Sequence, residues 1–583
     1  MFSLIKQKIN TVISMLLEIL VVVAILWSIR CVFLEALYLS ELKQLVLSAV
    51  LIVFTGTLFK NKKRYYACLG LLLTMFSSIF VIKLIRGEPI LHSMFNDLLL
   101  FATGLINAIL LIGVIGSHHM VKKARWLLIM VVFCPVVLLW GYYWSSEAWV
   151  SPDTLMAILQ TNVVESAEYL ADFMSWSDWV LIACLFLIIA FAALLPKKLE
   201  LKGLLRASSV VVVIALAGNI FCTYLHRRNV ITDIAIQTQE FIKGYRDFEI
   251  YKHQRKEKVE QQLANVSENA DGVYVLVIGE SQNRDHMSAY GYERDTTPWL
   301  KEMKEDKNLV FFNNAYSCHA HTVHALTYAL TAKNQYNGMK LSDSYSLIEV
   351  AEAAGFDTVW VSNQIRYSAW ETPIMMISNE ANQQYWNNAD RGEDGIIRYD
   401  MDLVDKFDEI KLSDKMLIVV HLMGSHWTYR NRYPKDFEKY TGNTLIDEYD
   451  NSIHYNDVVM KNLYEKISKI PSFKGMIYFS DHADAVKKNL GHNASNFVPE
   501  MTHIPLYMYF SNDYLEKYKA KVNNLLEKVD NIITNDLLFN IILGIMDIKV
   551  DDVYEAHNDI TEAHYDVSVG RFKTLYGNRS VFR

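Results

Sequence analysis

Seven long apolar runs fill the first 228 residues, and they limit the fold more than any other feature of the chain. They span residues 11–29, 43–59, 66–85, 98–116, 126–143, 179–195 and 207–225. Most approach the roughly 20 residues that a helix needs to cross a hydrocarbon core of about 30 Å. We therefore expect residues 1–228 to form a polytopic α-helical membrane domain of five to seven helices. The first run lacks the pattern of a cleavable signal peptide, so we expect it to remain as an anchor.

Basic residues beside the apolar runs predict the orientation of the chain. Two lysines precede the first run, and basic clusters follow the second, fourth and sixth runs at 60–64, 118–125 and 197–206. Cytoplasmic loops carry an excess of Lys and Arg. With seven spans these clusters all lie in the cytoplasm, and the basic residues 226–228 are the exception. The chain after residue 228 is then expected on the outer side of the membrane.

The loop between the fifth and sixth runs, residues 146–178, carries a helical pattern. Ser151 and Pro152 suit the N-cap and the first position of a helix. Apolar residues at 155, 156, 158 and 159 give that helix an apolar face. We expect an amphipathic helix that lies on the outer membrane surface. A connector that only packs against its neighbours is the alternative.

The chain changes character after the last apolar run. Residues 229–270 are polar and charged, which suits a helical linker, and from about residue 271 short β-rich runs alternate with helical segments. The β-rich runs lie at 273–279, 308–314, 357–363, 416–422, 476–481 and 504–510. Several are almost wholly apolar, as is typical of parallel strands with helices on both faces. Residues 271–583 are therefore expected to form a soluble α/β domain with a central, mostly parallel sheet.

Charge and cysteine content argue against a nucleic-acid partner and against a disulfide or a cysteine-based zinc site in the polar half. The 583 residues carry 57 basic and 64 acidic side chains, a net charge of −7, and we expect no nucleic-acid partner because such proteins need a basic patch. Of the six cysteines only Cys318 lies in the polar half. It has no partner there for a disulfide, and no CxxC zinc pattern is present.

Residues that can bind a metal follow four of the predicted strands. Glu280, His426 and the pair Asp481 and His482 each follow a strand, and a further strand leads into SCHAHT (317–322). Ligands bind at the carboxyl ends of the strands in sheets of this kind. Two carboxylates and an imidazole suit a divalent ion with an open fourth position, zinc in preference to manganese. A serine or threonine hydroxyl in that position would lose its proton more easily and become a nucleophile.

Several motifs resemble the phosphoethanolamine transferases of Gram-negative inner membranes, a family of the alkaline phosphatase/sulfatase superfamily. They are LQTNVVESAEYL (159–170), GESQNRDHMSAYGYERDTTPWL (279–300), SCHAHT (317–322), SLIEVAEAAGFDTVWVSNQ (346–364), VVHLMGSHWTYRNRYP (419–434), YDNSIHYNDVVM (449–460) and YFSDHAD (478–484). They cover most of 149–510 in the family's order. The family is associated with five membrane helices, fewer than the seven runs found here.

This resemblance implies a fold and an activity. The C-terminal domain would have the sulfatase-like fold and lie in the periplasm of a monomeric inner-membrane enzyme. The enzyme would move phosphoethanolamine from phosphatidylethanolamine to lipopolysaccharide, on lipid A or a core heptose, by a zinc-dependent ping-pong reaction. The lipid A-modifying branch has several disulfides in its soluble domain, so the lone Cys318 favours the core heptose branch. An added amine would lower the negative charge that attracts cationic peptides such as polymyxin.

The resemblance also implies roles for single residues. The zinc ligands would be Glu280, Thr322, Asp481 and His482, with Thr322 as the nucleophile that carries phosphoethanolamine. On the substrate side, His426 and His492 would contact the phosphoryl group or protonate the leaving oxygen, Thr161 and Glu165 would meet the donor headgroup, and His321 and His503 are further candidates. His503 could equally be a packed strand residue.

The stretch SCHAHTVHAL (317–326) has three interpretations by itself. It could be a metal-binding Cys/His tract, a disulfide anchor or a nucleophile with polar neighbours. With the resemblance, only Thr322 is expected on the metal. Cys318 is expected to pack as a free thiol, and His319 and His324 to be polar neighbours.

Three other functions compete with this one. A sulfatase would share the fold, but its nucleophile lies in a Cys/Ser-x-Pro-x-Arg signature and Cys318 is followed by HAHT. A phosphoglycerol transferase acting on periplasmic glucan or a glycerol-phosphate polymer would use similar threonine chemistry. A membrane scaffold or sensor with a degenerate domain is the non-enzymatic alternative. The full set of four predicted ligands argues against it.

Overall fold

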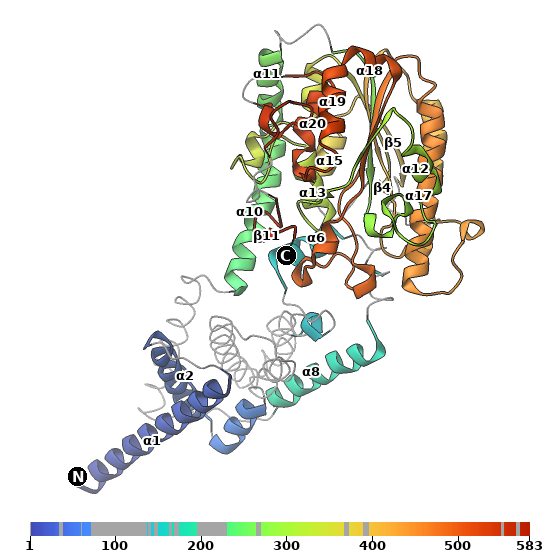
Figure 1. The fold of residues 1–583 in the computed structure, drawn as a ribbon. Helices are drawn as coiled ribbons and strands as arrows, with labels where there is room; N and C mark the ends of the chain where they lie inside the picture. The colour runs from blue at the N-terminus through green and yellow to red at the C-terminus, as the bar shows by residue number, and fades with distance from the viewer. Residues whose placement is uncertain are drawn as a thin grey trace. The chain divides into compact units, whose positions relative to one another are not determined.

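The computed structural model divides the chain into two compact units, which are described separately (Figure 1). The first unit comprises Met1–Pro152 and Phe173–Gln237, and the second comprises Asp153–Asp172 and Thr238–Arg583. The residues described are 2–33, 39–59, 61–71, 137, 141–144, 150–161, 166–167, 174–194, 230–263, 270–366, 372–388, 396–549, 553–566 and 572–582.

Three of the predicted apolar runs form helices in the first unit. These helices are α1 (Phe2–Phe33), α2 (Leu39–Thr57) and α8 (Trp176–Leu194). Among the described residues only the stretch Ile9–Ser28 of α1 is both long and apolar enough to cross a membrane, and α2 and α8 carry shorter apolar stretches. The runs 98–116 and 207–225 lie outside the described residues, and 66–85 and 126–143 lie largely outside them. The number of spans therefore stays a prediction.

Glu18 is an acidic residue inside the apolar stretch of α1. Its carboxylate accepts hydrogen bonds from the Lys62 ammonium at 3.1 Å and from the Tyr66 hydroxyl at 3.2 Å. Ionisable residues within apolar membrane helices usually have such partners. The bonds compensate the charge of Glu18 and tie α1 to the segment that follows α2.

The second unit is built on a seven-stranded sheet with the order β2-β8-β7-β1-β6-β4-β5. Its strands are β1 (Gly272–Gly279), β2 (Leu309–Phe312), β4 (Asp357–Ile365), β5 (Gln383–Asn388), β6 (Lys415–His421), β7 (Phe473–Ser480) and β8 (Leu506–Phe510). Strands β7, β1, β6, β4 and β5 pair in parallel, and β8 pairs antiparallel with both β7 and β2. All six predicted β-rich runs thus form strands of one mixed sheet.

Two features of the sheet were not predicted. The run 504–510 forms the strand β8, which is antiparallel to its neighbours β7 and β2, whereas the other neighbouring strands pair in parallel. The connection between β7 and β8 contains only short 3-10 turns, whereas a parallel return usually needs a longer crossover with a helix. Strand β5 was not predicted, because its sequence QQYWNN is mostly polar and lies half-buried at the sheet edge.

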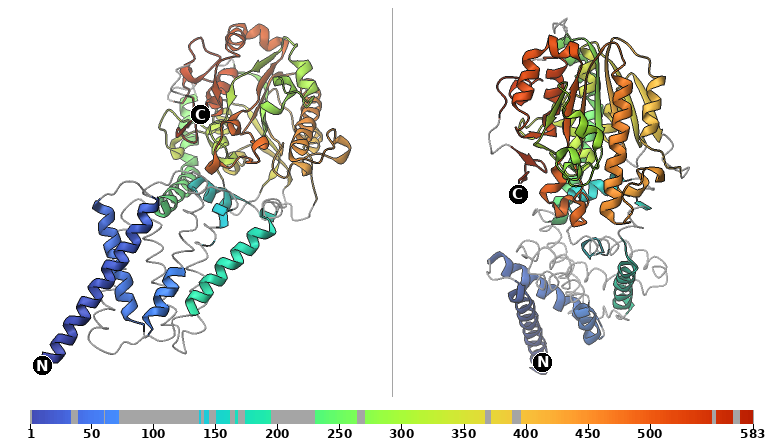
Figure 2. Two further views of the ribbon diagram at one scale, coloured as in Figure 1. Left: turned by 60° about the horizontal axis from the view of Figure 1, so that its bottom comes forward. Right: turned by 45° about the vertical axis from the view of Figure 1, so that its right-hand side comes forward.

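Helices cover both faces of the sheet (Figures 1 and 2). Alternate residues of β1 point to opposite faces, as a strand requires. Tyr274, Leu276 and Ile278 belong to a core with α13 (Thr322–Ala329), α14 (Leu347–Ala353), α15 (Pro373–Ser378), α19 (Lys519–Glu527) and α20 (Leu538–Ile545). Val273, Val275 and Val277 belong to a second core with α12 (Pro298–Met303), α16 (Met401–Lys406) and α17 (Leu445–Ile467). Burial on both faces explains why β1 is apolar throughout.

The segment expected as a helical linker packs on the second unit. It forms α10 (Val230–Ile250) and α11 (Lys252–Leu263), and Phe248 and Val259 are fully buried in the first of the two cores. The buried guanidinium of Arg255 in α11 makes two hydrogen bonds, of 2.9 and 3.2 Å, to the carboxylate of Glu349 in α14. Such bidentate pairs fix geometry as well as charge. From Thr238 onward these two helices are therefore part of the folded second unit.

The loop between the fifth and sixth runs contributes a helix to the second unit. Helix α6 (Pro152–Gln160) begins at Pro152, as predicted. Met156 on its inner face is 2% exposed and packs in the same core as α10 and α11. The Thr154 hydroxyl lies 2.9 Å from that of Ser495.

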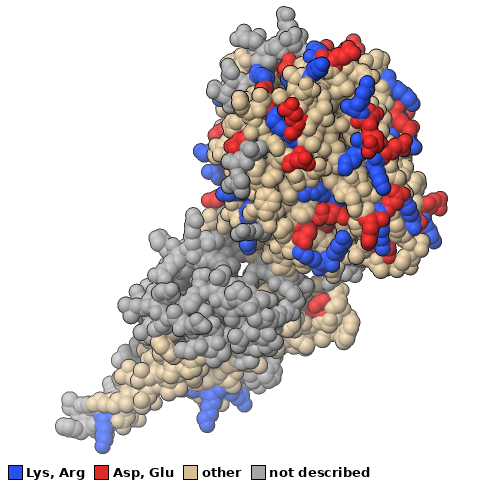
Figure 3. Space-filling view, in the orientation of Figure 1, with Lys and Arg blue, Asp and Glu red and all other residues tan. Residues whose placement is uncertain are grey.

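Charges of both signs are interspersed over the visible face of the second unit (Figure 3). The described part of the first unit is mainly uncharged on the same side. Charged residues in folded proteins mostly face water, so this face of the second unit is suited to contact with water.

Candidate active site

The ends of β1 and β7 bring three metal-competent side chains together. Because these strands pair in parallel in the middle of the sheet, Glu280 after β1 lies beside Asp481 and His482 after β7. All three are buried. Nε2 of His482 is 3.4 Å from Oε1 of Glu280 and 3.4 Å from Oδ2 of Asp481. One ligand atom from each residue fits within 4.8 Å of the others.

Thr322 completes this group from the opposite side. It is the first residue of α13, with His321 as the N-cap. Its Oγ1 lies 3.2 Å from Oε2 of Glu280 and 3.2 Å from Nε2 of His482. The four residues predicted as zinc ligands therefore converge on one point, although they come from three separate parts of the sequence.

The donor set fits a divalent cation. Oδ2 of Asp481 is buried and has no hydrogen-bond partner among the described residues, which is unusual for a carboxylate oxygen. Burial and the charge of Glu280 raise the pKa of Asp481 well above its usual range. Burial lowers the pKa of His482, but Asp481 and Glu280 outweigh this and raise it to about 10. Two buried carboxylates repel each other, and a cation at the free Asp481 oxygen would relieve this repulsion.

Local hydrogen bonds hold the two carboxylates in place. Oδ1 of Asp481 accepts from the backbone N–H groups of Ser281 and His482 at 3.0 and 2.7 Å. The Ser281 hydroxyl donates to Oε1 of Glu280 at 2.8 Å. Oδ2 of Asp481 is left without a partner among the described residues, and Oε2 of Glu280 is left to Thr322. The site is thus preorganised before any ligand binds.

The loop after β6 supports Glu280 from behind. Gly424 has φ +52°, and a Cβ there would lie 2.7 Å from the carbonyl oxygen of Glu280, so only glycine fits. The buried carboxylate of Asp400 accepts from the N–H groups of Met423 and Gly424, each at 2.8 Å. The same loop carries His426, whose Nδ1–H donates to the carbonyl of Trp427 at 2.7 Å. That bond leaves Nε2 of His426 free to act as an acceptor.

His492 lies on the other side of the cluster. Its ring centroid is 4.4 Å from that of His482, and its Nδ1–H donates to Oδ1 of Asp484 at 2.8 Å. Asp484 is buried, and its Oδ2 accepts from the Tyr429 hydroxyl at 2.5 Å. A histidine bonded in this way presents a defined Nε2 to a metal or a substrate.

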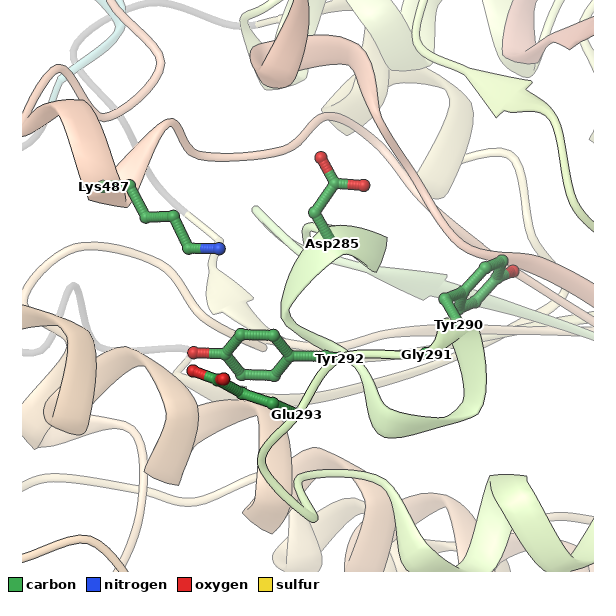
Figure 4. Close-up of a pocket in the computed structure, with 6 residues that line it drawn as sticks. All are labelled: Asp285, Tyr290, Gly291, Tyr292, Glu293 and Lys487. Carbon is green, nitrogen blue, oxygen red and sulfur yellow. The ribbon is translucent and has the colours of Figure 1, made fainter.

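His503 lies at a separate pocket of the second unit. Its Nδ1–H donates to Asp285 at 2.7 Å. Asp285 lines a pocket of about 420 Å³ together with Tyr290, Gly291, Tyr292, Glu293 and Lys487 (Figure 4). The Lys487 ammonium lies 5.1 Å from the centroid of the Tyr292 ring.

The three remaining candidates differ in their positions. His321 is next to Thr322, its Nδ1 is buried without a hydrogen-bond partner among the described residues, and its ring centroid is 5.8 Å from that of His492. Burial and the neighbouring histidines lower its pKa well below the usual value. The Thr161 hydroxyl donates to the carbonyl of Ala157 at 2.6 Å, at the end of α6. Glu165 lies outside the described residues.

Several supporting residues were not predicted from the sequence. Asp484 and Asp400 orient the loops described above, and Asn535 accepts from the N–H of Cys318 at 2.8 Å and donates to the carbonyl of Asp481 at 2.7 Å. Asp484 stands in the motif YFSDHAD, so its spacing from Asp481 was a visible signal. Nothing local marks Asp400 or Asn535. Cys318 is a buried free thiol, as predicted.

Known proteins share this sequence and this fold. Residues 273–548 match the sulfatase family. Phosphoethanolamine transferase EptC of Escherichia coli O18:K1:H7 (strain RS218 / NMEC) is 31% identical over 414 residues, which cover 64% of this chain and 70% of that protein. The Kdo(2)-lipid A phosphoethanolamine 7''-transferase of E. coli K12 is 27% identical over 269 residues, covering 43% of this chain and 46% of that protein.

One similar solved structure also includes a membrane part. It is the integral membrane protein lipooligosaccharide phosphoethanolamine transferase A (EptA) from Neisseria meningitidis, which is 20% identical, covers 88% of this chain and 97% of its own, and has a TM-score of 0.59. At this identity the likeness shows a shared fold. The likeness to the E. coli EptC enzyme extends over more than two thirds of that protein's length. The chain therefore belongs to the phosphoethanolamine transferase family, whose soluble domain has the sulfatase-like fold of the alkaline phosphatase superfamily, and it is an enzyme of the transferase class.

Proposed function

We propose that this enzyme transfers phosphoethanolamine from phosphatidylethanolamine to lipopolysaccharide, with Thr322 as the nucleophile. The observation that carries the proposal is the position of Oγ1 of Thr322, 3.2 Å from both Glu280 and His482. A hydroxyl that lies beside two carboxylates and an imidazole able to bind one metal ion is positioned to be activated as a nucleophile. Glu280, Thr322, Asp481 and His482 would hold a zinc ion.

Zinc suits this donor set better than the other common divalent ions. Carboxylate and imidazole ligands bind zinc with four-coordinate geometry, and the order of affinities places it above manganese. When bound there, the ion supplies Lewis acidity that lowers the pKa of a hydroxyl beside it.

The first half-reaction uses residues on both sides of Thr322. Oγ1 of Thr322 attacks the phosphorus of phosphatidylethanolamine, a new phosphorus–oxygen bond forms, and the bond to diacylglycerol breaks. His426 and His492 are proposed to bind the phosphoryl oxygens, and Nε2 of one of them would accept the hydroxyl proton of Thr322 and pass it to the leaving oxygen of diacylglycerol. Phosphoethanolamine then remains on Thr322.

The second half-reaction restores the enzyme. A hydroxyl or phosphate of the acceptor attacks the same phosphorus, and the bond to Oγ1 of Thr322 breaks. Binding of donor and acceptor in turn gives ping-pong kinetics. Thr161 and Glu165 are proposed to meet the ethanolamine headgroup, and His321 and His503 to line the path of a substrate.

The membrane location follows from the substrates. We propose that residues 1–228 form a polytopic domain of five to seven helices in a Gram-negative inner membrane, that 229–270 join it to the rest, and that 271–583 form the periplasmic catalytic domain of a monomer. Donor and acceptor are both lipids, so an enzyme anchored beside them meets them at high local concentration. The long apolar helix α1 supports this arrangement.

The acceptor is proposed to be a core heptose, with lipid A as the alternative. Cys318 is a buried free thiol, in keeping with the resemblance to the branch that lacks disulfides in the soluble domain. The similar E. coli K12 enzyme is named for Kdo(2)-lipid A, which favours the alternative. Either product would lower surface charge and weaken the binding of polymyxin.

Mass spectrometry of lipopolysaccharide from cells with and without the gene tests the proposal. We expect phosphoethanolamine on core oligosaccharide or lipid A only when the wild-type gene is present. Thr322→Ala should abolish the modification, and Thr322→Ser should retain part of it because the hydroxyl remains. Modification that is undiminished in Thr322→Ala would reject the nucleophile. If the gene instead led to phosphoglycerol on glucans and to no phosphoethanolamine on lipopolysaccharide, the proposed donor and acceptor would both be rejected.

A further inference from the structure

A second group of metal-competent side chains lies on the far flank of the nucleophile segment. Asp153, at the start of α6, meets His319 and His324, which stand before and after Thr322 in the sequence. Nε2 of His319 is 3.7 Å from Oδ1 of Asp153, and Nε2 of His324 is 3.8 Å from the same oxygen. One ligand atom from each residue fits within 4.8 Å of the others.

The two imidazole nitrogens in this group lack partners. His319 is 0% exposed and His324 is 1% exposed, and Nε2 of each is buried without a hydrogen bond to any described residue. Buried side-chain nitrogens are nearly always bonded. Two such atoms aimed at one carboxylate oxygen therefore indicate that something binds between them.

The distances decide what that ligand is. Separations of 3.7 and 3.8 Å are too long for hydrogen bonds. Ligands bonded at about 2.0–2.1 Å around a tetrahedral ion lie roughly 3.3 Å apart, so a small inward movement of the side chains is enough. We propose that Asp153, His319 and His324 form a second metal site, separate from the catalytic cluster, that binds a divalent ion of the zinc class.

The hydrogen bonds at Nδ1 of His319 and His324 show which tautomer each ring must adopt for an ion to bind at Nε2. Nδ1 of His324 is bonded to the Tyr576 hydroxyl, which can accept from Nδ1–H and leave Nε2 free for the ion. Nδ1 of His319 accepts from the backbone N–H of His321 at 3.1 Å, which puts the ring proton on Nε2. Binding of the ion therefore requires the other neutral tautomer of His319, with the proton on Nδ1, and the His321 amide must give up its acceptor.

The proposed site would join two distant parts of the chain. Asp153 comes from the segment between the fifth and sixth apolar runs, whereas His319 and His324 lie on the segment that carries Thr322. Two histidines and one carboxylate leave a fourth position for water or a substrate oxygen. The ion would fasten α6 to the start of α13 and thus hold the nucleophile segment in register with α6.

Metal counting on the full-length protein in detergent tests this site. The protein is stripped with a chelator, reloaded in a zinc buffer at neutral pH and measured by plasma mass spectrometry. Asp153→Asn should bind one equivalent less than the wild type. Glu280→Gln, which alters the catalytic cluster, should lose a different equivalent, and the double variant should lose both. Asp178→Asn is the matched control, because Asp178 bonds only to Ser175 among the contacts described, and should lose none.

A second measurement guards against a folding defect in the variants. Crystals of the zinc-loaded wild type should show an anomalous peak between Oδ1 of Asp153 and Nε2 of His319 and His324. Equal zinc content in the wild type and Asp153→Asn would overturn the proposal. So would a wild-type crystal with a peak at the catalytic cluster and none at Asp153. Neither result depends on transferase activity, so the catalytic proposal stands or falls separately.

Discussion

Oδ1 of Asp484 accepts a hydrogen bond of 2.8 Å from Nδ1–H of His492, and it lies 4.0 Å from Nδ1 of His482. One buried carboxylate thus faces two histidines of the candidate active site. Its other oxygen accepts a hydrogen bond from the Tyr429 hydroxyl, so the orientation of the Asp484 carboxylate is fixed. The hydrogen bond from His492 to this carboxylate in turn fixes the His492 ring. Outer partners of this kind set both the tautomer and the direction of a histidine.

Asp484→Asn should therefore impair turnover without unfolding the protein. The amide either turns its NH2 group toward Nδ1–H or loses the charge that steadies the ring, and we expect a loss of about 10- to 100-fold in kcat. Initial rates with a fluorescent phosphatidylethanolamine analogue measure this effect. Tyr429→Phe is the milder control, because it removes one bond and leaves the carboxylate. An unchanged rate in Asp484→Asn beside an inactive His492→Gln would contradict the role given to Asp484.

Removal of divalent metal should stop the reaction and lower thermal stability. Without a cation, the buried carboxylates of Glu280 and Asp481 repel each other. A ligand present at 100 times its Kd adds about 2.7 kcal/mol to the free energy of unfolding, so zinc should raise the Tm of stripped protein by several degrees. Differential scanning fluorimetry in detergent provides the measurement. Glu280→Gln should lose the part of this zinc-dependent shift that the catalytic cluster contributes, and a full shift in that variant would mean that the ion does not stabilise the protein at that cluster.

Arg255→Met should destabilise the second unit strongly. The substitution leaves Glu349 buried without its bidentate partner, and removal of one member of a buried pair costs about 3–5 kcal/mol. Lys256→Met is the matched control, because Lys256 pairs with Glu352 at 3.1 Å while remaining 47% exposed, and exposed pairs contribute about 0–1 kcal/mol. Thermal denaturation of both variants separates the two cases. Similar Tm values would mean that α11 is not fastened to α14 as described.

Asp457 should make stability depend on pH. Its buried carboxyl accepts from the N–H groups of Trp299 and Leu300 at the start of α12, yet burial raises its pKa to about 7. The unfolded value is about 3.9. Between these two values the folded protein holds a proton that the unfolded chain has lost, so the free energy of unfolding falls as pH rises.

Asp457→Asn should remove this part of the pH dependence. In the wild type, the contribution of protonated Asp457 to the free energy of unfolding is full below about pH 4. It is lost as the pH rises through about 7, a difference of up to about 4 kcal/mol. Melting curves of the wild type and the variant at several values from about pH 4.5 to about pH 8 cover most of the interval between the two pKa values. They measure the difference in pH-dependent stability directly. Parallel pH profiles for the two proteins would contradict the raised pKa.

The sequence predicted those parts of the site that follow strands. A strand that is apolar throughout ends where its first polar residue stands, so Glu280, Asp481 and His482 could be placed on one edge of the sheet from the pattern alone. Thr322 needed more, because four polar neighbours compete with it in SCHAHTVHAL. Only the resemblance to a known family singled it out, and the structure places its hydroxyl beside the other three.

Long-range contacts could not be predicted in the same way. The direction of β8 depends on how its connection returns, and its apolar pattern is the same in either direction. Asp400 and Asn535 act through bonds to backbone groups far away in the sequence. Asp153 lies in the first turn of α6, where acidic residues are common, and its approach to His319 and His324 depends on the packing of α6.

The packing of α6, α10 and α11 on the second unit has a practical consequence for any soluble version of this enzyme. A fragment that starts at residue 271 would uncover the apolar groove filled by Phe248 and Val259 and leave Glu349 without Arg255. A fragment that starts near Thr238 would keep α11 and most of α10. It would still lack α6, which comes from between two of the apolar runs and cannot be included by moving one end of the chain. Crystallisation and kinetic work on such fragments would therefore study a catalytic centre with an open flank, and adding α6 as a separate peptide or as a grafted N-terminal helix would close it.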